Sequence, residues 1–158
     1  MISNWNRDAS QTQNPLGLRT FGVPPSKITN FLWLGNLYDA MDERFVVDNI
    51  DEVILVGGWH PPQMFPGIAY VHYPLPQPFG KMLPRAESVV ERLKTNHKRH
   101  TATLLVCAEG IDRGPTLALK FLKENGLVPN RPTSWKQAVA LIKKHRPIAV
   151  PHRDWWPP

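Results

Sequence analysis

Apolar and polar residues along the chain follow two periods, one typical of strands and the other of helices. Short apolar runs, each closed by glycine, proline or a change to polar residues, predict strands at 28–35, 52–56, 68–75 and 102–106. Apolar positions at helical spacing predict helices at 36–50, 84–96, 115–126 and 135–145. Because strands and helices alternate, the chain predicts an α/β domain with a central, mostly parallel sheet flanked by helices in three layers.

Individual residues mark where these helices begin and end. Pro84 suits the first turn of a helix, and Ser134 is typical of an N-cap. Gly126 and Pro147 predict the ends of the third and fourth helices. In the first helix, the residues at the spacing of an apolar stripe are Leu37, Met41, Phe45 and Asp48.

The pattern divides the chain into two parts. Residues 1–27, rich in Asn, Gln, Ser, Gly and Pro near their start, predict an N-terminal arm or irregular lead-in. Residues 28–158 carry all the periodic segments and predict a single catalytic domain. Near the end, we expect Trp155 and Trp156 to pack onto the core.

Composition adds expectations about the surroundings of the protein. The 158 residues are 42% apolar and contain no apolar run long enough to span a bilayer. The polar first 17 residues do not resemble a secretory signal, and a lone cysteine suits a reducing compartment, so we expect a cytoplasmic protein. The net charge of +6 is concentrated at 81–100 and 125–158, which either attracts anionic partners or forms an ordinary solvated face.

The lone cysteine lies in the segment LLVCAEGIDRGPT, between a predicted strand and a predicted helix. Cys107 is either a small core residue or a nucleophile at the carboxyl end of the sheet, where α/β proteins bind ligands. Gly110 and Gly114 allow a tight turn whose N–H groups, together with the helix N-terminus, form a site for an anion. Arg113 offers a planar fork for two phosphate oxygens.

This arrangement also predicts the chemistry. A helix N-terminus and an arginine favour the thiolate over the thiol, and the thiolate is the nucleophilic form. Cys107 would attack the phosphorus of a bound phosphate ester, and water would then hydrolyse the cysteinyl-phosphate. The glycines, the strand before the cysteine and the helix after it favour this interpretation over a core cysteine.

The segment VCAEGIDRGPTLALKFL resembles the signature loop of the cysteine-based protein phosphatases, in particular the compact dual-specificity branch. The similarity extends over residues 28–154, including ITNFLWLGNLYDA and WKQAVALIKKHRPIAVPHRDW. It implies that Cys107 is the nucleophile and Arg113 the phosphate clamp, without a metal or another cofactor. It also implies that the phosphate-binding residues are Ala108, Glu109, Gly110, Ile111, Asp112 and Arg113.

Two residues of the loop depart from the family pattern. Val106 stands where the family usually has His, and Gly114 where it usually has Ser or Thr. That hydroxyl helps the thiolate leave in the family. Thr116 could replace it only if the helix began differently, so we expect Thr116 to be a residue of the helix N-terminus.

The family's general acid, an Asp roughly 30 residues before the cysteine, is missing from the segment YPLPQPFGK. Gln77 is nearest to its place, but an amide cannot donate a proton in this way, and a turn residue is the simpler interpretation. The loop offers Glu109 and Asp112 instead, and the acid before Arg resembles the loop of myotubularin-type phosphatases. Asp112 either acts as the acid or ion-pairs with a basic neighbour, and His72 is a further candidate.

The predicted function is therefore hydrolysis of phosphotyrosine or phosphoserine/threonine in proteins. The alternatives are a phosphoinositide or RNA 5′-phosphate phosphatase of the same fold, or a phosphate-binding pseudophosphatase with little turnover. Nucleic acid binding through the basic segments is disfavoured because no known nucleic-acid-binding motif is present. The six histidines lack the spacing of a metal site.

Overall fold

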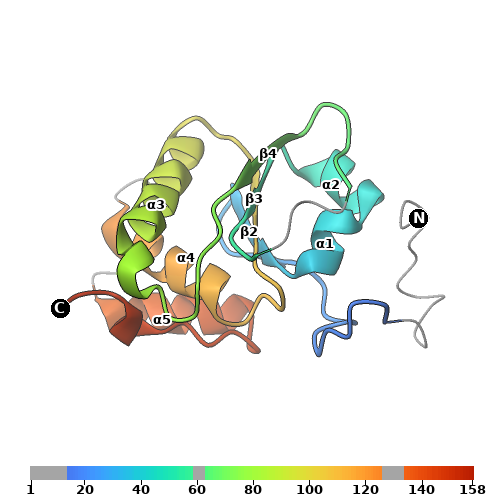
Figure 1. The fold of residues 1–158 in the computed structure, drawn as a ribbon. Coiled ribbons are helices and arrows are strands. Elements are labelled where there is room, and N and C mark those ends of the chain that lie inside the picture. The colour runs from blue at the N-terminus through green and yellow to red at the C-terminus, as the bar shows by residue number, and fades with distance from the viewer. Residues whose placement is uncertain (1–13, 59–62, 126–133) are drawn as a thin grey trace.

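The computed structural model describes residues 14–58, 63–125 and 134–158. Its centre is a sheet in the order β1-β2-β5-β3-β4, in which β1 is antiparallel to β2 and the other neighbours are parallel. The strands are β1 Ser26–Lys27, β2 Leu32–Gly35, β3 Glu52–Leu55, β4 Ala69–His72 and β5 Thr103–Val106. Helices cover both faces of the sheet (Figure 1), so the predicted three-layer α/β fold is confirmed.

The middle of the sheet is fully buried. Every residue of β3 and β5 is buried, as expected of parallel strands covered on both faces. In register, Val106 lies opposite Gly35 on one side and Leu55 on the other. The carboxyl ends of these strands therefore meet at one edge, and Cys107 follows the strand between the other two.

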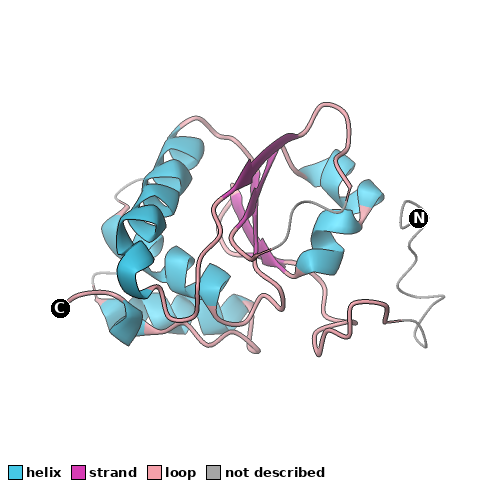
Figure 2. Ribbon diagram, in the orientation of Figure 1, coloured by secondary structure: helices cyan, strands magenta, loops and turns pink. Residues whose placement is uncertain are grey.

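One face of the sheet is covered by α3 Leu83–Lys98, α4 Arg113–Glu124 and α5 Trp135–His145. These helices lie together in Figure 2, and α4 contacts both of its neighbours. Pro84 lies in the first turn of α3, and the Ser134 side chain accepts a hydrogen bond from Gln137 N at the start of α5, as predicted. The apolar stripes of both helices face the core cluster.

The other face carries two short helices, α1 Leu37–Met41 and α2 Glu43–Asn49, where the sequence predicts a single helix. That prediction is wrong at Asp42, whose backbone is extended and whose side chain accepts a hydrogen bond from Phe45 N at 3.2 Å. Asp42 thus ends α1 and caps α2. Asp48, placed in the apolar stripe by its spacing, is exposed.

Helix α4 begins at Arg113, two residues before the predicted start. Arg113 and Gly114 therefore belong to its first turn. At the other end, Asn125 is the C-cap. The predicted stop at Gly126 lies outside the described residues.

Both ends of the described chain return to the domain. Two short 3-10 turns, Gly80–Met82 and Arg153–Trp155, flank the contact between Phe79 and Trp156, whose rings lie 5.1 Å apart. Trp156 is buried, which confirms that the tail packs onto the core. Before the first central strand, β1 adds an antiparallel edge to the sheet. The division of the chain at residue 28 stays a prediction. Among the described residues, no helix combines the length and apolar content that a bilayer crossing requires.

Candidate active site

A pocket of about 240 Å³ opens at the carboxyl edge of the sheet. It brings together five of the six residues that the sequence assigns to phosphate binding, with Cys107 at their start. Gln77 and Arg19 complete the lining. The lining residues are Arg19, Gln77, Cys107, Ala108, Glu109, Ile111, Asp112 and Arg113.

Cys107 is a free thiol that is only 3% exposed. Its Sγ accepts a hydrogen bond of 3.4 Å from Gly114 N, in the first turn of α4. The sulfur lies at the N-terminal end of α4, beside a backbone N–H that donates to it. The buried thiol thus combines core packing with the setting of a nucleophile.

Four carbonyl groups of the loop after Cys107 accept hydrogen bonds from residues that do not line the pocket. The acceptors are the carbonyl oxygens of Ala108, Gly110, Ile111 and Asp112. Their donors, in the same order, are Leu37 N at 3.1 Å, Arg146 Nε at 2.8 Å, Val150 N at 2.7 Å and Thr116 N at 3.0 Å. Within the described parts of the chain, the N–H groups of 108–112 donate to no other group. A loop with fixed carbonyls and unused N–H groups is suited to an anion.

Gly110 is the loop residue that lies behind the pocket instead of lining it. Its φ of +69° and its close neighbours require glycine, because a Cβ would lie 2.5 Å from Arg146 Nη2 and 2.8 Å from Gly35 O. Arg146 is 1% exposed and also donates to Pro24 O at 3.0 Å and Ser26 Oγ at 2.9 Å. One buried guanidinium therefore ties the loop to Pro24 and to the first residue of β1.

Arg113 enters the pocket from the first residue of α4. Its Nη1 donates to Leu75 O at 3.0 Å, which fixes one edge of the guanidinium. Its Nε is buried and has no hydrogen-bond partner among the described residues. This donor fits the phosphate-clamp role that the sequence assigns to Arg113.

The two loop carboxylates have different surroundings. Glu109 accepts hydrogen bonds from Arg19 Nε at 2.7 Å and from the N–H and hydroxyl of Thr20 at 3.2 and 3.1 Å. Burial acts to raise the pKa of Glu109, but these hydrogen bonds outweigh it and the pKa is lowered. Glu109 is therefore an anion at neutral pH and a poor proton donor.

Asp112 lines the pocket, and its Oδ1 lies 2.8 Å from His152 Nε2. The sequence left two roles open, an acid in the pocket and a partner for a basic neighbour. The structure shows the pairing with a basic neighbour and also places Asp112 in the lining of the pocket, and its role as the acid stays a prediction.

The other residues considered from the sequence, His72, Thr116 and Gln77, differ in their contacts and in their position relative to the pocket. His72 Nε2 lies 3.0 Å from Gly57 O, and His72 does not line the pocket. The Thr116 hydroxyl accepts from His152 N at 2.9 Å, which fits the expected structural role at the start of α4. Gln77, interpreted from the sequence as a turn residue, lines the pocket.

Three residues that line the pocket or contact its loop were missed because they come from distant segments: Arg19 before the sheet, and Arg146 and His152 after α5. No local spacing links them to Cys107. The only signal was the similarity of the tail HRPIAVPHRDW to the family pattern, which assigned no role to Arg146 or His152. Among the described residues, no group of three or more His, Cys, Asp or Glu side chains could hold a metal ion.

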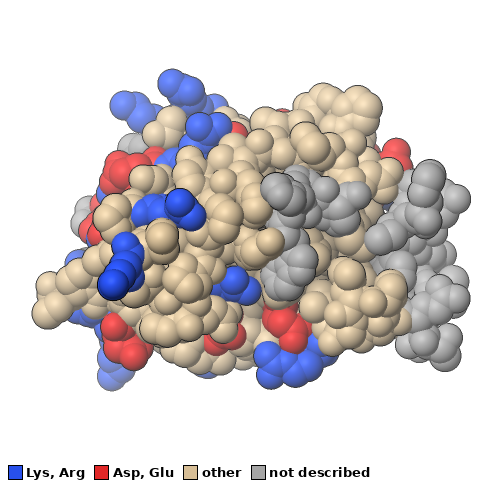
Figure 3. Space-filling view, viewed as in Figure 1, with Lys and Arg blue, Asp and Glu red and all other residues tan. Residues whose placement is uncertain are grey.

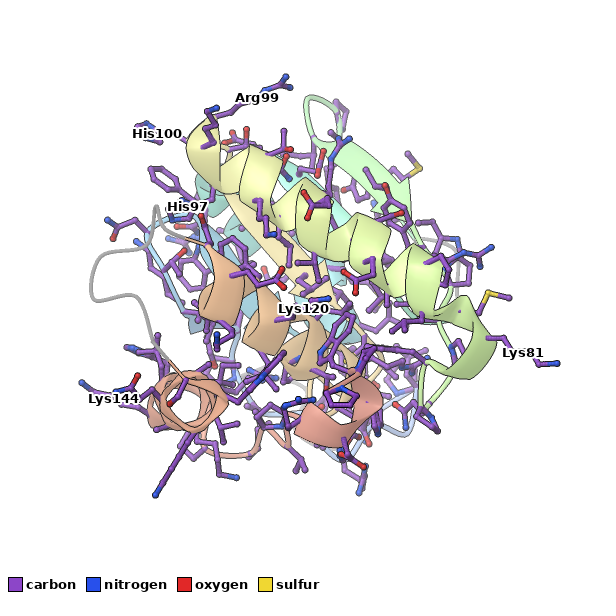
Figure 4. The ribbon with its side chains drawn as sticks, turned by 90° about the vertical axis from the view of Figure 1, so that its left-hand side faces the viewer. Lys81, His97, Arg99, His100, Lys120 and Lys144 are labelled. Atoms are coloured by element: carbon purple, nitrogen blue, oxygen red, sulfur yellow. The ribbon has the colours of Figure 1, made fainter. Side chains whose placement is uncertain are left out.

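Among the described residues of the two basic segments, none lines this pocket, although Arg146 and His152 of the second segment contact its loop. On the described part of the face shown in Figure 3, Lys and Arg are interspersed with Asp and Glu. In Figure 4, Lys81, Arg99 and Lys144 extend away from the domain, whereas Lys120 lies between α3 and α4, where it pairs with Glu87. Of the described residues, the cations that line the pocket are Arg19 and Arg113.

Comparisons with known proteins agree with the fold. No family model matches the chain. The chain is 26% identical over 138 residues to mouse dual specificity protein phosphatase 14, covering 83% of this chain and 65% of the relative. Rat dual specificity protein phosphatase 18 is 27% identical, with 83% and 63% covered. The chain thus spans somewhat less than two thirds of these relatives.

Solved structures show the same fold. Human DUSP28 superposes with a TM-score of 0.70 at 21% identity, covering 84% of this chain and 88% of that one. A mouse dual specificity phosphatase in complex with zinc tungstate gives 0.70 at 21% identity, covering 91% and 87%. The resemblance to the compact dual-specificity phosphatases is confirmed by both kinds of comparison.

Proposed function

We propose that this protein is a cysteine-dependent phosphatase that hydrolyses phosphotyrosine or phosphoserine/threonine in proteins. The observation that carries the proposal is the loop of 108–112, whose fixed carbonyls leave its N–H groups available beside the Cys107 thiol. The dual-specificity phosphatases among its relatives support the same activity.

The proposed reaction begins when a phosphate dianion accepts hydrogen bonds from the loop N–H groups and Arg113. The Cys107 thiolate attacks phosphorus, the S–P bond forms and the bond to the leaving oxygen breaks. Asp112 gives that oxygen a proton. Water then attacks phosphorus, gives its proton to the Asp112 carboxylate, and releases inorganic phosphate and the Cys107 thiolate.

A second candidate is a phosphate-binding pseudophosphatase. It is favoured by Gly114, which provides no hydroxyl beside Cys107 to assist breakdown of the cysteinyl-phosphate. Phosphoinositides and RNA 5′-phosphates are the alternative substrates. The +6 charge supports attraction to anionic surfaces, whereas no lysine is among the described residues that line the pocket, which gives no support to nucleic acid as a substrate.

We further propose a cytoplasmic location. The support is chemical, since the chain has one cysteine, and a nucleophilic thiol must stay reduced to act.

A substrate panel with matched variants tests the function. Phosphopeptides, phosphoinositides, RNA 5′-phosphates and an aryl phosphate would be compared on wild type, Cys107→Ser, Arg113→Lys and the exposed-site control Ser88→Ala. We expect Cys107→Ser to abolish turnover, Arg113→Lys to reduce it by about 10²-fold or more, and Ser88→Ala to match wild type. Full activity in Cys107→Ser excludes the mechanism. A phosphate burst without further turnover identifies the pseudophosphatase.

A further inference from the structure

The wall of the pocket formed by Asp112 is supported from behind by the C-terminal tail. His152 Nε2 lies 2.8 Å from Asp112 Oδ1, and the two side chains are 27% and 24% exposed. We propose that His152 is the positioning residue for the general acid: it orients Asp112 and stabilises the carboxylate left after proton donation. This inference rests on the proposed phosphatase function and identifies the residue that supports its acid step.

His152 is held firmly enough for this role. Its ring stacks on Trp155 with centroids 4.3 Å apart and an angle of 4° between planes. Its backbone N–H donates to the Thr116 hydroxyl at 2.9 Å, which fixes the residue to the first turn of α4. Trp156 donates from Nε1 to Thr116 O at 2.9 Å, so the tail is attached on both sides of Trp155. The imidazole therefore approaches Asp112 from a fixed direction.

The pair leaves one carboxylate oxygen available. Oδ1 of Asp112 contacts His152, while Oδ2 hydrogen-bonds to no described residue. Since Asp112 lines the pocket, Oδ2 is the oxygen that can reach a substrate. A carboxylic acid held by one oxygen and free at the other has the geometry of a directed proton donor.

Charges around the pair come from both of its sides. Arg19, Glu109 and Arg113 line the pocket next to Asp112. On the tail side, the Arg153 guanidinium lies 4.2 Å from the centroid of the Trp135 ring, so it is engaged on an aromatic surface. Lys120, from α4, pairs with Glu87 of α3 and lies over the Trp156 ring. An incoming phosphate adds negative charge on the pocket side of Asp112.

The proton balance of the acid step is simple. The Oδ2–H of Asp112 passes to the leaving oxygen as the O–P bond breaks and the S–P bond to Cys107 forms. The new carboxylate accepts a hydrogen bond from His152 Nε2–H. In the second step that carboxylate takes a proton from the attacking water while the S–P bond breaks.

Two substrates separate the acid step from the rest of the reaction. An aryl phosphate with an acidic leaving group needs no proton donor, whereas an alkyl phosphate needs one. We expect His152→Phe, which keeps an aromatic ring against Trp155, to lower kcat for the alkyl phosphate by about tenfold with KM unchanged. The aryl phosphate should be affected less than twofold. His152→Gln, which retains an amide donor, should recover part of the loss.

A double-mutant cycle distinguishes positioning from a general loss of structure. If His152 acts through Asp112, Asp112→Asn/His152→Phe is no slower on the alkyl phosphate than Asp112→Asn. Equal slowing of both substrates by His152→Phe, or equal slowing with and without Asp112, overturns the inference. His145→Phe, at the exposed end of α5, is the matched control and should match wild type.

Other experimental results would overturn the proposed phosphatase function itself. Turnover that survives Cys107→Ser overturns the phosphatase mechanism, and a burst without turnover overturns steady-state catalysis. A selective loss of alkyl-phosphate turnover in Asp112→Asn that is absent from His152→Phe, with Cys107 still essential, overturns only the assignment of His152. If Asp112→Asn also leaves the alkyl phosphate unaffected, Asp112 is not the acid and both assignments fall. Tungstate binding by each variant shows that the loop has folded.

Discussion

Arg19 Nε donates a hydrogen bond of 2.7 Å to Oε2 of Glu109, so the chain before the sheet contacts the loop that follows Cys107. Thr20 donates to the other carboxylate oxygen, and Asn36 Nδ2 donates to Thr20 O at 2.8 Å. The contacts from Arg19 and Thr20 offset the negative charge of the Glu109 carboxylate, which would otherwise repel a bound phosphate. The segment that precedes the strands is thus part of the pocket, although its composition alone predicts an irregular lead-in.

Replacement of Glu109 by Gln should reveal this contact through its pH dependence. Because the pKa of Glu109 is lowered in the folded state, its carboxylate stabilises the fold above the ordinary value of 4.5, and this contribution is lost as the pH falls through the lowered folded value. We expect Glu109→Gln to be less stable than wild type at pH 7 and to be so by a smaller margin near pH 3. Urea denaturation at both pH values measures the difference. A gap that does not change with pH would contradict the prediction.

Replacement of Arg146 by Lys tests the buried connection behind the loop. A lysine cannot donate to Gly110 O, Pro24 O and Ser26 Oγ together, because its single ammonium lacks the planar fork. We expect a loss of about 3 kcal/mol in the free energy of unfolding, and a fall in Tm of roughly 6 to 12 °C. Calorimetry measures both, and phosphate affinity should fall with the loss of loop order.

Lys144→Met is the control for that experiment, since Lys144 extends into solvent from α5 (Figure 4). Its Tm should stay within about 2 °C of wild type. If Arg146→Lys also kept its Tm and its phosphate affinity, the guanidinium would not be what fixes the loop.

The sequence predicts the sheet, the helices of one face and the loop at Cys107 because each depends on local patterning. A buried strand, a glycine turn and an amphipathic helix are all defined by residues that are close in the chain. The break at Asp42 was not predicted because the apolar residues keep helical spacing on both sides of it. The side-chain cap that separates the two helices does not change that spacing.

Likewise, the sequence predicts only those residues of the candidate site that lie in one continuous segment of the chain. Cys107, Asp112 and Arg113 belong to one loop, so one segment identifies them. Arg146 and His152 reach that loop from the tail after α5, and their role depends on how α4 and α5 pack. Such contacts are set by tertiary structure, and one sequence without its fold carries no spacing that reports them.

His97 predicts a separate effect of acid on stability. It is buried between Phe31 and Phe121, and its Nδ1 has no hydrogen-bond partner among the described residues. Burial and, to a lesser extent, the charge of His100 lower the pKa of His97. His97 therefore binds a proton more readily in the unfolded chain than in the folded protein. The free energy of unfolding consequently falls as the pH drops below about 6.5.

We expect His97→Leu to remove part of this acid sensitivity. The free energy of unfolding of the variant should fall less than that of wild type between pH 7 and pH 5, measured by urea denaturation. Parallel curves for the two proteins over this range would show that His97 is protonated equally in the folded and unfolded states.

Gly114 offers the opportunity to restore a hydroxyl beside the nucleophile. A Cβ added there would lie 3.5 Å from Cys107 Sγ, 3.8 Å from Leu34 Cδ2 and 3.9 Å from Leu105 Cγ, all ordinary contacts. A serine hydroxyl can therefore reach the sulfur without displacing the core. A hydrogen bond to a charged group contributes about 1.5 to 3 kcal/mol, so the leaving thiolate should be stabilised and the second step accelerated about tenfold or more.

Rapid-quench kinetics with an aryl phosphate would measure this effect. Gly114→Ser should raise the steady-state rate and reduce the burst of the leaving group, because the cysteinyl-phosphate no longer accumulates. Gly114→Ala adds the same Cβ without a hydroxyl and should leave the second step unchanged. If alanine and serine accelerated the reaction equally, the gain would come from a more rigid α4, and if neither did, breakdown of the cysteinyl-phosphate would not limit turnover in this loop.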